Sequence, residues 1–61
     1  MHVDLFVTRS QVDSAKIVPL DVPGVGTIEV KLDPIMDEGM QIRMHGRSPD
    51  GGDVYAHIKI H

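Results

Sequence analysis

Four histidines are the side chains of this 61-residue chain that could bind a metal ion or move a proton near neutral pH. His57 and His61 fall on the same face of an expected strand. Four residues at roughly 3.3 Å each separate them by about 13 Å, which is too far for one ion. His2 and His45 approach each other only if the fold brings them together. We therefore predict solvated surface histidines, no metal site and no cofactor, and we keep a small metal-dependent hydrolase built on the histidines as an alternative.

Catalytic patterns are equally sparse. Ser10 or Ser48 can be combined on paper with a histidine and an aspartate into a hydrolytic triad, as in most sequences, but no nucleophile-elbow pattern is present. The glycines of residues 24–26 lack the third glycine and the following helix of a dinucleotide loop. A chain of this length also has little interior from which water can be excluded. We predict that the protein is not an enzyme and has no catalytic residue.

Composition narrows the class further. The chain has a formal net charge of −3, with six Lys and Arg spread among nine Asp and Glu, which disfavours a nucleic-acid partner. It has no Cys, so neither disulfides nor thiolate zinc sites are available to support the fold. No cationic leader followed by an apolar run is present, and no apolar segment approaches the roughly 20 residues of a membrane span. We expect one soluble, cytoplasmic domain over residues 1–61 with no membrane partner.

The elements that must position any site are strands. Apolar side chains, mostly Val, Ile and Leu, alternate with polar ones in five segments separated by Gly, Pro and Asp turns. These segments are residues 3–8, 17–22, 27–32, 40–44 and 54–60. Residues 9–14 could form one helical turn. The pattern predicts an all-β fold, a small antiparallel sandwich or barrel of about five strands.

Two details refine this prediction. Pro19 cannot donate to a strand ladder, so the segment 17–22 should lie at a sheet edge or at a bulge. The methionines divide between core and surface: Met40 and Met44 fall on the inward phase of their strand, whereas Met36 lies in a loop and should be the more exposed. An edge strand with alternating apolar side chains leaves backbone donors and acceptors free to pair with another chain.

From Gly26 onward the sequence GTIEVKLDPIMDEGMQIRMHGRSPDGGDVYAHIKIH resembles the C-terminal substrate-binding domain of DnaJ (Hsp40) co-chaperones. In that family a strand leads into an amphipathic turn ending in Gly, then an Ile-Arg strand, a Gly-bearing loop, a Gly-Asp-Leu-Tyr-like element and a strand ending near His. The positions that match are Gly39, Ile42, Arg43, Gly46, Gly52, Asp53, Val54, Tyr55, Ile58, Ile60 and His61. Residues 3–22 are similar to the family's first two strands, more loosely.

The resemblance implies the first of two tandem barrel-like domains, whose hydrophobic groove binds an extended segment of an unfolded client polypeptide as an added strand. Mapped onto this sequence, the peptide-binding groove consists of Val3, Leu5, Val18, Leu20, Val22 and Ala56. Alternation alone gives these residues a second interpretation, since they would follow the same pattern if they only filled a sandwich core. An assembly module that pairs its edge strand with a second copy is the alternative function.

The chain also departs from the family. The His-Pro-Asp signature of the J-domain is absent, as are the cysteines of the zinc module, the second barrel and the dimerisation segment. Val18 and Val25 stand where lysines that bind the acidic Hsp70 tail would be expected. We therefore expect any contact with an Hsp70 to depend on parts of a parent protein outside these 61 residues.

Overall fold

The computed structural model describes all of residues 1–61 and consists of five strands and one short helix. The elements, in chain order, are β1 (His2–Val7), α1 (Arg9–Asp13), β2 (Ile17–Val22), β3 (Gly26–Lys31), β4 (Gln41–Met44) and β5 (Val54–Ile60). The small all-β fold predicted from the alternation is confirmed. The predicted strands agree with the observed ones to within one residue at every end, and the helical turn forms as α1.

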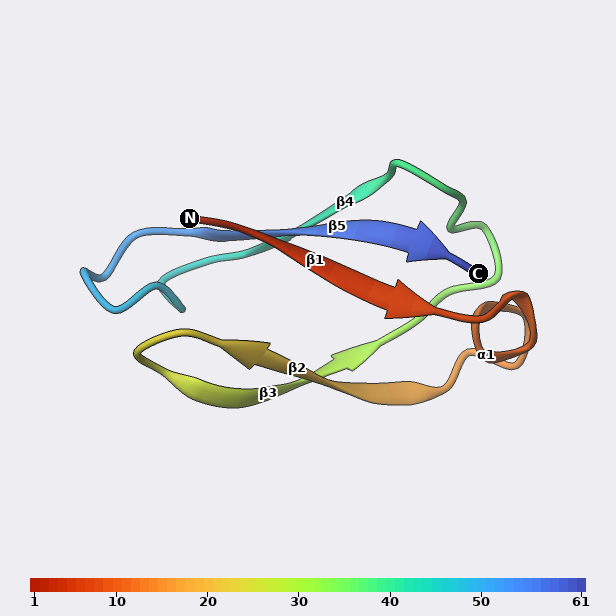
Figure 1. The fold of residues 1–61 in the computed structure, drawn as a ribbon, viewed down its shortest axis with the longest axis horizontal. Helices are drawn as coiled ribbons and strands as arrows, with labels where there is room; N and C mark the ends of the chain where they lie inside the picture. Colours follow the sequence, from red (N-terminus) through yellow and green to blue (C-terminus); the bar gives the residue numbers. More distant parts are fainter.

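The strands form two sheets that lie as two layers (Figure 1). One has three strands in the order β1-β5-β4, and the other is the β2-β3 hairpin. β4 and β5 are antiparallel, as are β2 and β3, but β1 runs parallel to β5, with His2 opposite Tyr55 and Val7 opposite Ile60. The prediction of a purely antiparallel fold is wrong for this one pair. Alternation determines which face of a strand is buried, but it does not determine the strand's direction.

The core lies between the two layers and is wholly apolar. Eleven side chains are buried, and none of them is polar or charged. They are Leu5, Val7, Val12, Val18, Leu20, Val22, Val30, Leu32, Val54, Ala56 and Ile58. Every strand except β4 contributes to this set, and β4 packs half-buried side chains against it. The two sheets are therefore held together by burial of aliphatic surface.

Helix α1 connects the layers at one end of the molecule (Figure 1). Thr8 caps it: its hydroxyl accepts from the Gln11 N–H at 3.1 Å, and the Gln11 side chain accepts from the Thr8 N–H at 2.8 Å. Val12 is the helix residue that enters the core. This reciprocal cap ends β1 at Val7 and turns the chain toward the second sheet.

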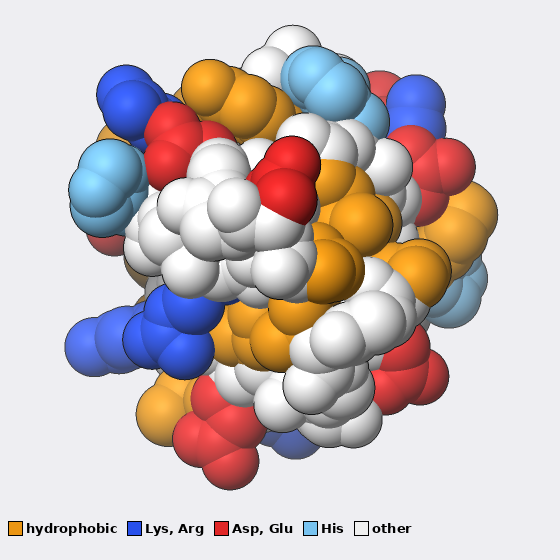
Figure 2. Space-filling model, turned by 90° about the vertical axis from the view of Figure 1, so that its left-hand side faces the viewer, with side chains coloured by type: hydrophobic (Ala, Val, Ile, Leu, Met, Phe, Trp, Pro, Cys, Tyr) orange, Lys and Arg blue, Asp and Glu red, His pale blue; other side chains and the backbone are white.

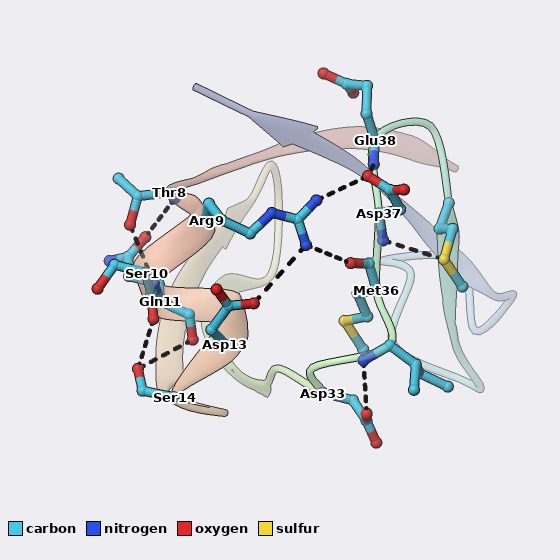
Figure 3. Close-up of polar contacts among 12 residues, drawn as sticks. Thr8, Arg9, Ser10, Gln11, Asp13, Ser14, Asp33, Met36, Asp37 and Glu38 are labelled. Carbon is cyan, nitrogen blue, oxygen red and sulfur yellow. Dashed lines mark hydrogen bonds and ion pairs between the residues drawn. The ribbon is translucent and has the colours of Figure 1, made fainter.

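Arg9 attaches the helix to the loop before β4 (Figure 3). Its guanidinium donates to the Asp37 carboxylate at 2.8 Å and to the Met36 carbonyl at 3.3 Å, and it lies 3.9 Å from Asp13. The Met36 side chain packs against the core, whereas Met40 is exposed. The sequence predicted the opposite for these two methionines. The prediction fails at Met40 because this residue lies just before β4 rather than inside it.

The single helix of the structure has five residues, and nothing in the chain forms a helix of the length and apolar character that a bilayer crossing requires.

We predict that the core tolerates little truncation. A 61-residue domain has a free energy of unfolding of about 3–9 kcal/mol, at about 0.05–0.15 kcal/mol per residue. Ile58 is fully buried, so Ile58→Ala should lower this free energy by about 2–5 kcal/mol and Ile58→Val by about 0.5–1.5 kcal/mol. The measurement is urea unfolding followed by circular dichroism.

The matched controls are Ile17→Ala and Ile17→Val, since Ile17 is 61% exposed. Both should change the free energy of unfolding by less than about 0.5 kcal/mol. Equal effects at the two positions would contradict the assignment of the core.

Candidate functional site

The six residues predicted to line a groove do not form an open one in this structure. Five of them are buried in the core, and Val3 is half-buried against it. The buried five are Leu5, Val18, Leu20, Val22 and Ala56. These residues therefore fill the core, which is the second of the two interpretations that the alternation left open. The reason is the smallness of the chain: two sheets of five short strands need all their inward apolar side chains to cover each other.

With the inward faces buried, the parts of the sheets left for recognition are their edges and their outer faces. β2 is an edge strand, as Pro19 predicted, because the two-stranded sheet gives it one neighbour only. The Leu32 N–H donates to the Lys16 carbonyl at 2.9 Å, so these two residues form a hydrogen-bonded pair of the antiparallel ladder. Hydrogen-bonded pairs alternate along such a ladder, so the even-numbered residues of β2 bond to β3. Pro19 therefore lies at a position whose backbone faces the free edge. An added strand would find no donor at the middle of β2, which makes this edge poorly suited to strand addition.

The free edges of β3 and β4 are also poorly suited to an added strand. On β3 the residues that face the free edge are Thr27, Glu29 and Lys31, and charged side chains of this kind discourage pairing. On β4 the Ile58 N–H donates to the Met40 carbonyl at 2.8 Å, which leaves only Gln41 and Arg43 facing outward in a four-residue strand.

The free edge of β1 has no proline, carries one carboxylate, and belongs to a strand of six residues, longer than β4. The Tyr55 N–H donates to the Met1 carbonyl at 2.8 Å and the His61 N–H to the Val7 carbonyl at 2.9 Å, so β5 is bound by the odd-numbered residues of β1. The N–H and C=O groups of His2, Asp4 and Phe6 consequently face away from β5. We call these three residues the β1 edge. All three are exposed, no proline interrupts them, and Phe6 is a large apolar side chain with 67% of its surface exposed.

The outer face of the three-stranded sheet adds an imidazole cluster beside this edge. It consists of His2, Tyr55 and His57. The His2 ring stacks on Tyr55 with ring centroids 5.0 Å apart, and Nδ1 of His2 lies 2.8 Å from Nε2 of His57. Both neighbours come from β5, because the register sets His2 opposite Tyr55 and Asp4 opposite His57.

Sequence reasoning did not find this cluster. It weighed His2 against His45 and His57 against His61, because the parallel pairing that joins the two ends of the chain was not anticipated. The signal that could have found it is the shared alternation of residues 2–7 and 54–60, which allows the strands to be neighbours in either direction.

Asp53 fixes the loop that leads into β5. Its carboxylate lies 2.6 Å from Nε of Arg43 and 2.9 Å from Nδ1 of His45, and it accepts the Gly46 N–H at 3.3 Å. The hydrogen bond from Arg43 holds the pKa of Asp53 below its ordinary value of 3.8, against the opposing effect of desolvation. These contacts close the 44–54 loop on itself, so the role of Asp53 is to place the start of β5.

The end of the molecule that carries this loop and the β2-β3 turn shows hydrophobic side chains in the middle of the face and charged groups around its rim (Figure 2). The two loops touch here: a Cβ added at Gly24 would lie 2.9 Å from Cγ of Pro49. Gly24 has a φ of +80°, which other residues rarely adopt. The structure has no pocket, and no three metal-ligating side chains are grouped in a way that could hold an ion.

Comparison with known proteins yields no match: no protein-family description, no curated protein and no solved structure matches this chain. The resemblance to the DnaJ substrate-binding domain therefore stays a prediction from the sequence.

We predict that acid destabilises the fold partly through Asp53. A carboxylate whose pKa is lower in the folded than in the unfolded chain stabilises the fold above its unfolded pKa, and this contribution is lost as the pH falls through the folded value. The same direction holds for Asp37, with its backbone bond from Glu38 and its pairing with Arg9, and for Asp50, with its bond from Ser48. The urea midpoint should therefore fall between about pH 5 and pH 2.

Asp53→Asn should give a lower midpoint at pH 6 and a flatter decline toward acid than the parent. Glu29→Gln removes one negative charge from an exposed strand position and is the matched control. If D53N and E29Q declined with the same slope, the contribution of the Arg43–Asp53 pair to acid sensitivity would be excluded.

Proposed function

We propose that this domain binds extended polypeptide segments by strand addition on the β1 edge. The observation that carries the proposal is the row of exposed backbone groups of His2, Asp4 and Phe6. They lie on a sheet edge that is longer than that of β4 and that neither proline nor a pair of charged side chains protects. In strand addition the main-chain hydrogen bonds supply affinity and alternate side chains supply specificity. The sequence led to the same mode of binding but expected it at residues 17–22.

The side chains of the β1 edge indicate which segments would bind. Phe6 offers apolar surface, and Asp4 stands between it and His2 on the same outward face. A segment with an apolar residue near Phe6 and a Lys or Arg opposite Asp4 would complement both. The net charge of −3 favours a basic partner over an acidic one.

Self-association through the same edge is less well supported. If two copies paired their β1 edges antiparallel with full overlap, Asp4 of one copy would stand opposite Asp4 of the other, and His2 would stand opposite Phe6. Like charges directly opposite each other destabilise a strand pair. Asp4 therefore favours a different polypeptide over a second copy of the chain.

The wider role follows from the sequence resemblance alone. If the parent protein is an Hsp40-type co-chaperone, the bound segments are exposed apolar stretches of unfolded clients, held weakly and reversibly because the site is shallow. The cytoplasmic location, the absence of catalysis and any contact with an Hsp70 through other parts of the parent protein remain predictions of the same kind.

The test is an amide-resolved NMR titration of the chain with an extended heptapeptide of alternating apolar residues that has Lys at its centre. We expect fast-exchange shifts concentrated at the amides of His2, Asp4 and Phe6, whose N–H groups face the free edge. The amides of β2 and β3 should not respond. Saturable shifts confined to Ile17–Val22, or none at any residue, would contradict the proposal.

Two substitutions separate edge pairing from ordinary surface binding. Asp4→Pro removes a donor from the β1 edge without removing a bond to β5, so it should abolish the shifts while leaving β5 folded. Pro19→Ala restores the missing donor of β2 and should create a second, weaker response at residues 17–22. Asp4→Lys, which keeps every backbone group, serves as the control in case D4P fails to fold.

Sedimentation of the free chain at several concentrations reports self-association, and a mass that rises with concentration would favour a second copy as the occupant.

The charge at the centre of the peptide should also matter. An opposite-charge pair across a strand contributes about 0.5–1 kcal/mol, so replacing the central Lys with Glu should weaken binding about two- to five-fold. With Asp4→Lys the preference should reverse. Equal affinities of both peptides for the unsubstituted chain would show that Asp4 does not face the bound segment.

A further inference from the structure

We infer that His2 and His57 together form a binding site for a divalent transition-metal ion that accepts imidazole nitrogen, of the copper or nickel type. The two rings come from opposite ends of the chain, and the parallel pairing of β1 with β5 brings them together on the outer face of the sheet. Nδ1 of His2 and Nε2 of His57 lie 2.8 Å apart. In the absence of metal, the two nitrogens share one proton, because one must donate and the other accept.

The 2.8 Å separation is that of a hydrogen bond between the rings, so binding one ion requires that the shared proton leave and that both nitrogen lone pairs turn toward a common point. Two imidazole nitrogens that bind one ion at about 2.0 Å with an angle near 90° lie about 2.8 Å apart, as in square-planar or octahedral geometry, whereas a tetrahedral angle requires about 3.3 Å. Square-planar nitrogen sites are typical of Cu(II) and Ni(II), and Cu(II) is the tightest binder among the divalent first-row ions. The closeness of the two rings and the general order of affinities together favour Cu(II), with Ni(II) as the second ion to test.

The surroundings of the pair hold the rings in place. His2 stacks on Tyr55 with an angle of 18° between the ring planes, which limits the orientations of the imidazole. The plane of the His57 ring lies at 34° to that of His2, with ring centroids 5.0 Å apart. His57 is half-buried, because its strand β5 lies between β1 and β4. Two partly oriented ligands lose less side-chain entropy on binding than two free ones.

The remaining coordination positions face solvent. No third His, Cys, Asp or Glu is grouped with the pair as a ligand, so water would complete the coordination of the ion. A site with two protein ligands and open positions binds reversibly. An ion there would join the first residue of β1 to the middle of β5, and it would thereby stabilise the folded chain by mass action.

The other two histidines provide the controls. His45 pairs with Asp53 in the 44–54 loop, with Nδ1 2.9 Å from the carboxylate, and His61 follows the end of β5. Neither is paired with a second imidazole. A metal ion that merely binds exposed histidines would depend on them as much as on His2 and His57.

The experiment is a calorimetric titration of the chain with CuCl₂ and with NiCl₂ at pH 7.5, repeated for four His→Gln variants. H2Q and H57Q should each weaken binding at least ten-fold, while H45Q and H61Q should bind like the parent. Because imidazole binds metal only when it is neutral, affinity should also fall when the pH is lowered to 5.5. Addition of metal should raise the thermal unfolding temperature of the unsubstituted chain, and this increase should be lost in H57Q.

Loss of binding in H2Q but not in H57Q would overturn the proposal, because it would place the ion on the N-terminal amine and His2 alone. Equal effects of all four variants would overturn it as well, since that result describes adventitious binding to surface histidines. If either variant fails to fold, addition of Cu(II), which is paramagnetic in every geometry, to the unsubstituted chain decides the question, with paramagnetic broadening read at the rings of His2 and His57. Broadening centred elsewhere would contradict the site.

Discussion

β5 pairs with β1 on one side and with β4 on the other, and the rest of the structure depends on its pairing with β1. This parallel pair joins residues that are more than fifty positions apart, so it closes the chain over its whole length. It places Leu5 and Val7 beside Ala56 and Ile58 on the inner face of the sheet, where the β2-β3 hairpin covers them. Without it the hairpin would have only β4 and β5 to pack against, and a sheet of two short strands is marginal in water.

The same pairing decides which surfaces are left for recognition. A parallel ladder uses alternate residues of each strand, and in β1 these are the odd-numbered ones, whose side chains are also the inward ones. The even-numbered residues His2, Asp4 and Phe6 therefore turn both their side chains and their free backbone groups toward solvent. In β2 the same arrangement holds for Ile17, Pro19 and Asp21, but there proline removes the central donor. The two edges have similar patterns and differ in whether the central residue offers a backbone donor.

Much of the fold could be predicted from the alternation, because burial of one face imposes a period of two on any strand. The edge position of β2 followed from Pro19 in the same way. The direction of β1 could not be predicted, since the inward residues of a strand are the same whichever way it runs. The pair His2 and His57 depended on that missing direction. For the groove residues, spacing could not separate a lining from a core, and the size of the chain decides in favour of the core.

Size also explains why recognition by this domain would use backbone and outer faces. Eleven aliphatic side chains fill the space between the sheets, and none of the buried side chains is polar. An internal site would need several of these positions for chemistry, and each such replacement would remove an appreciable part of a total stability of about 3–9 kcal/mol. Strand addition needs none of them, because its hydrogen bonds come from main-chain groups that the fold leaves unpaired. A metal ion between His2 and His57 makes equally small demands on the core, since both rings lie on the outer face. Both proposed sites thus lie where the fold can accept a ligand without loss of burial.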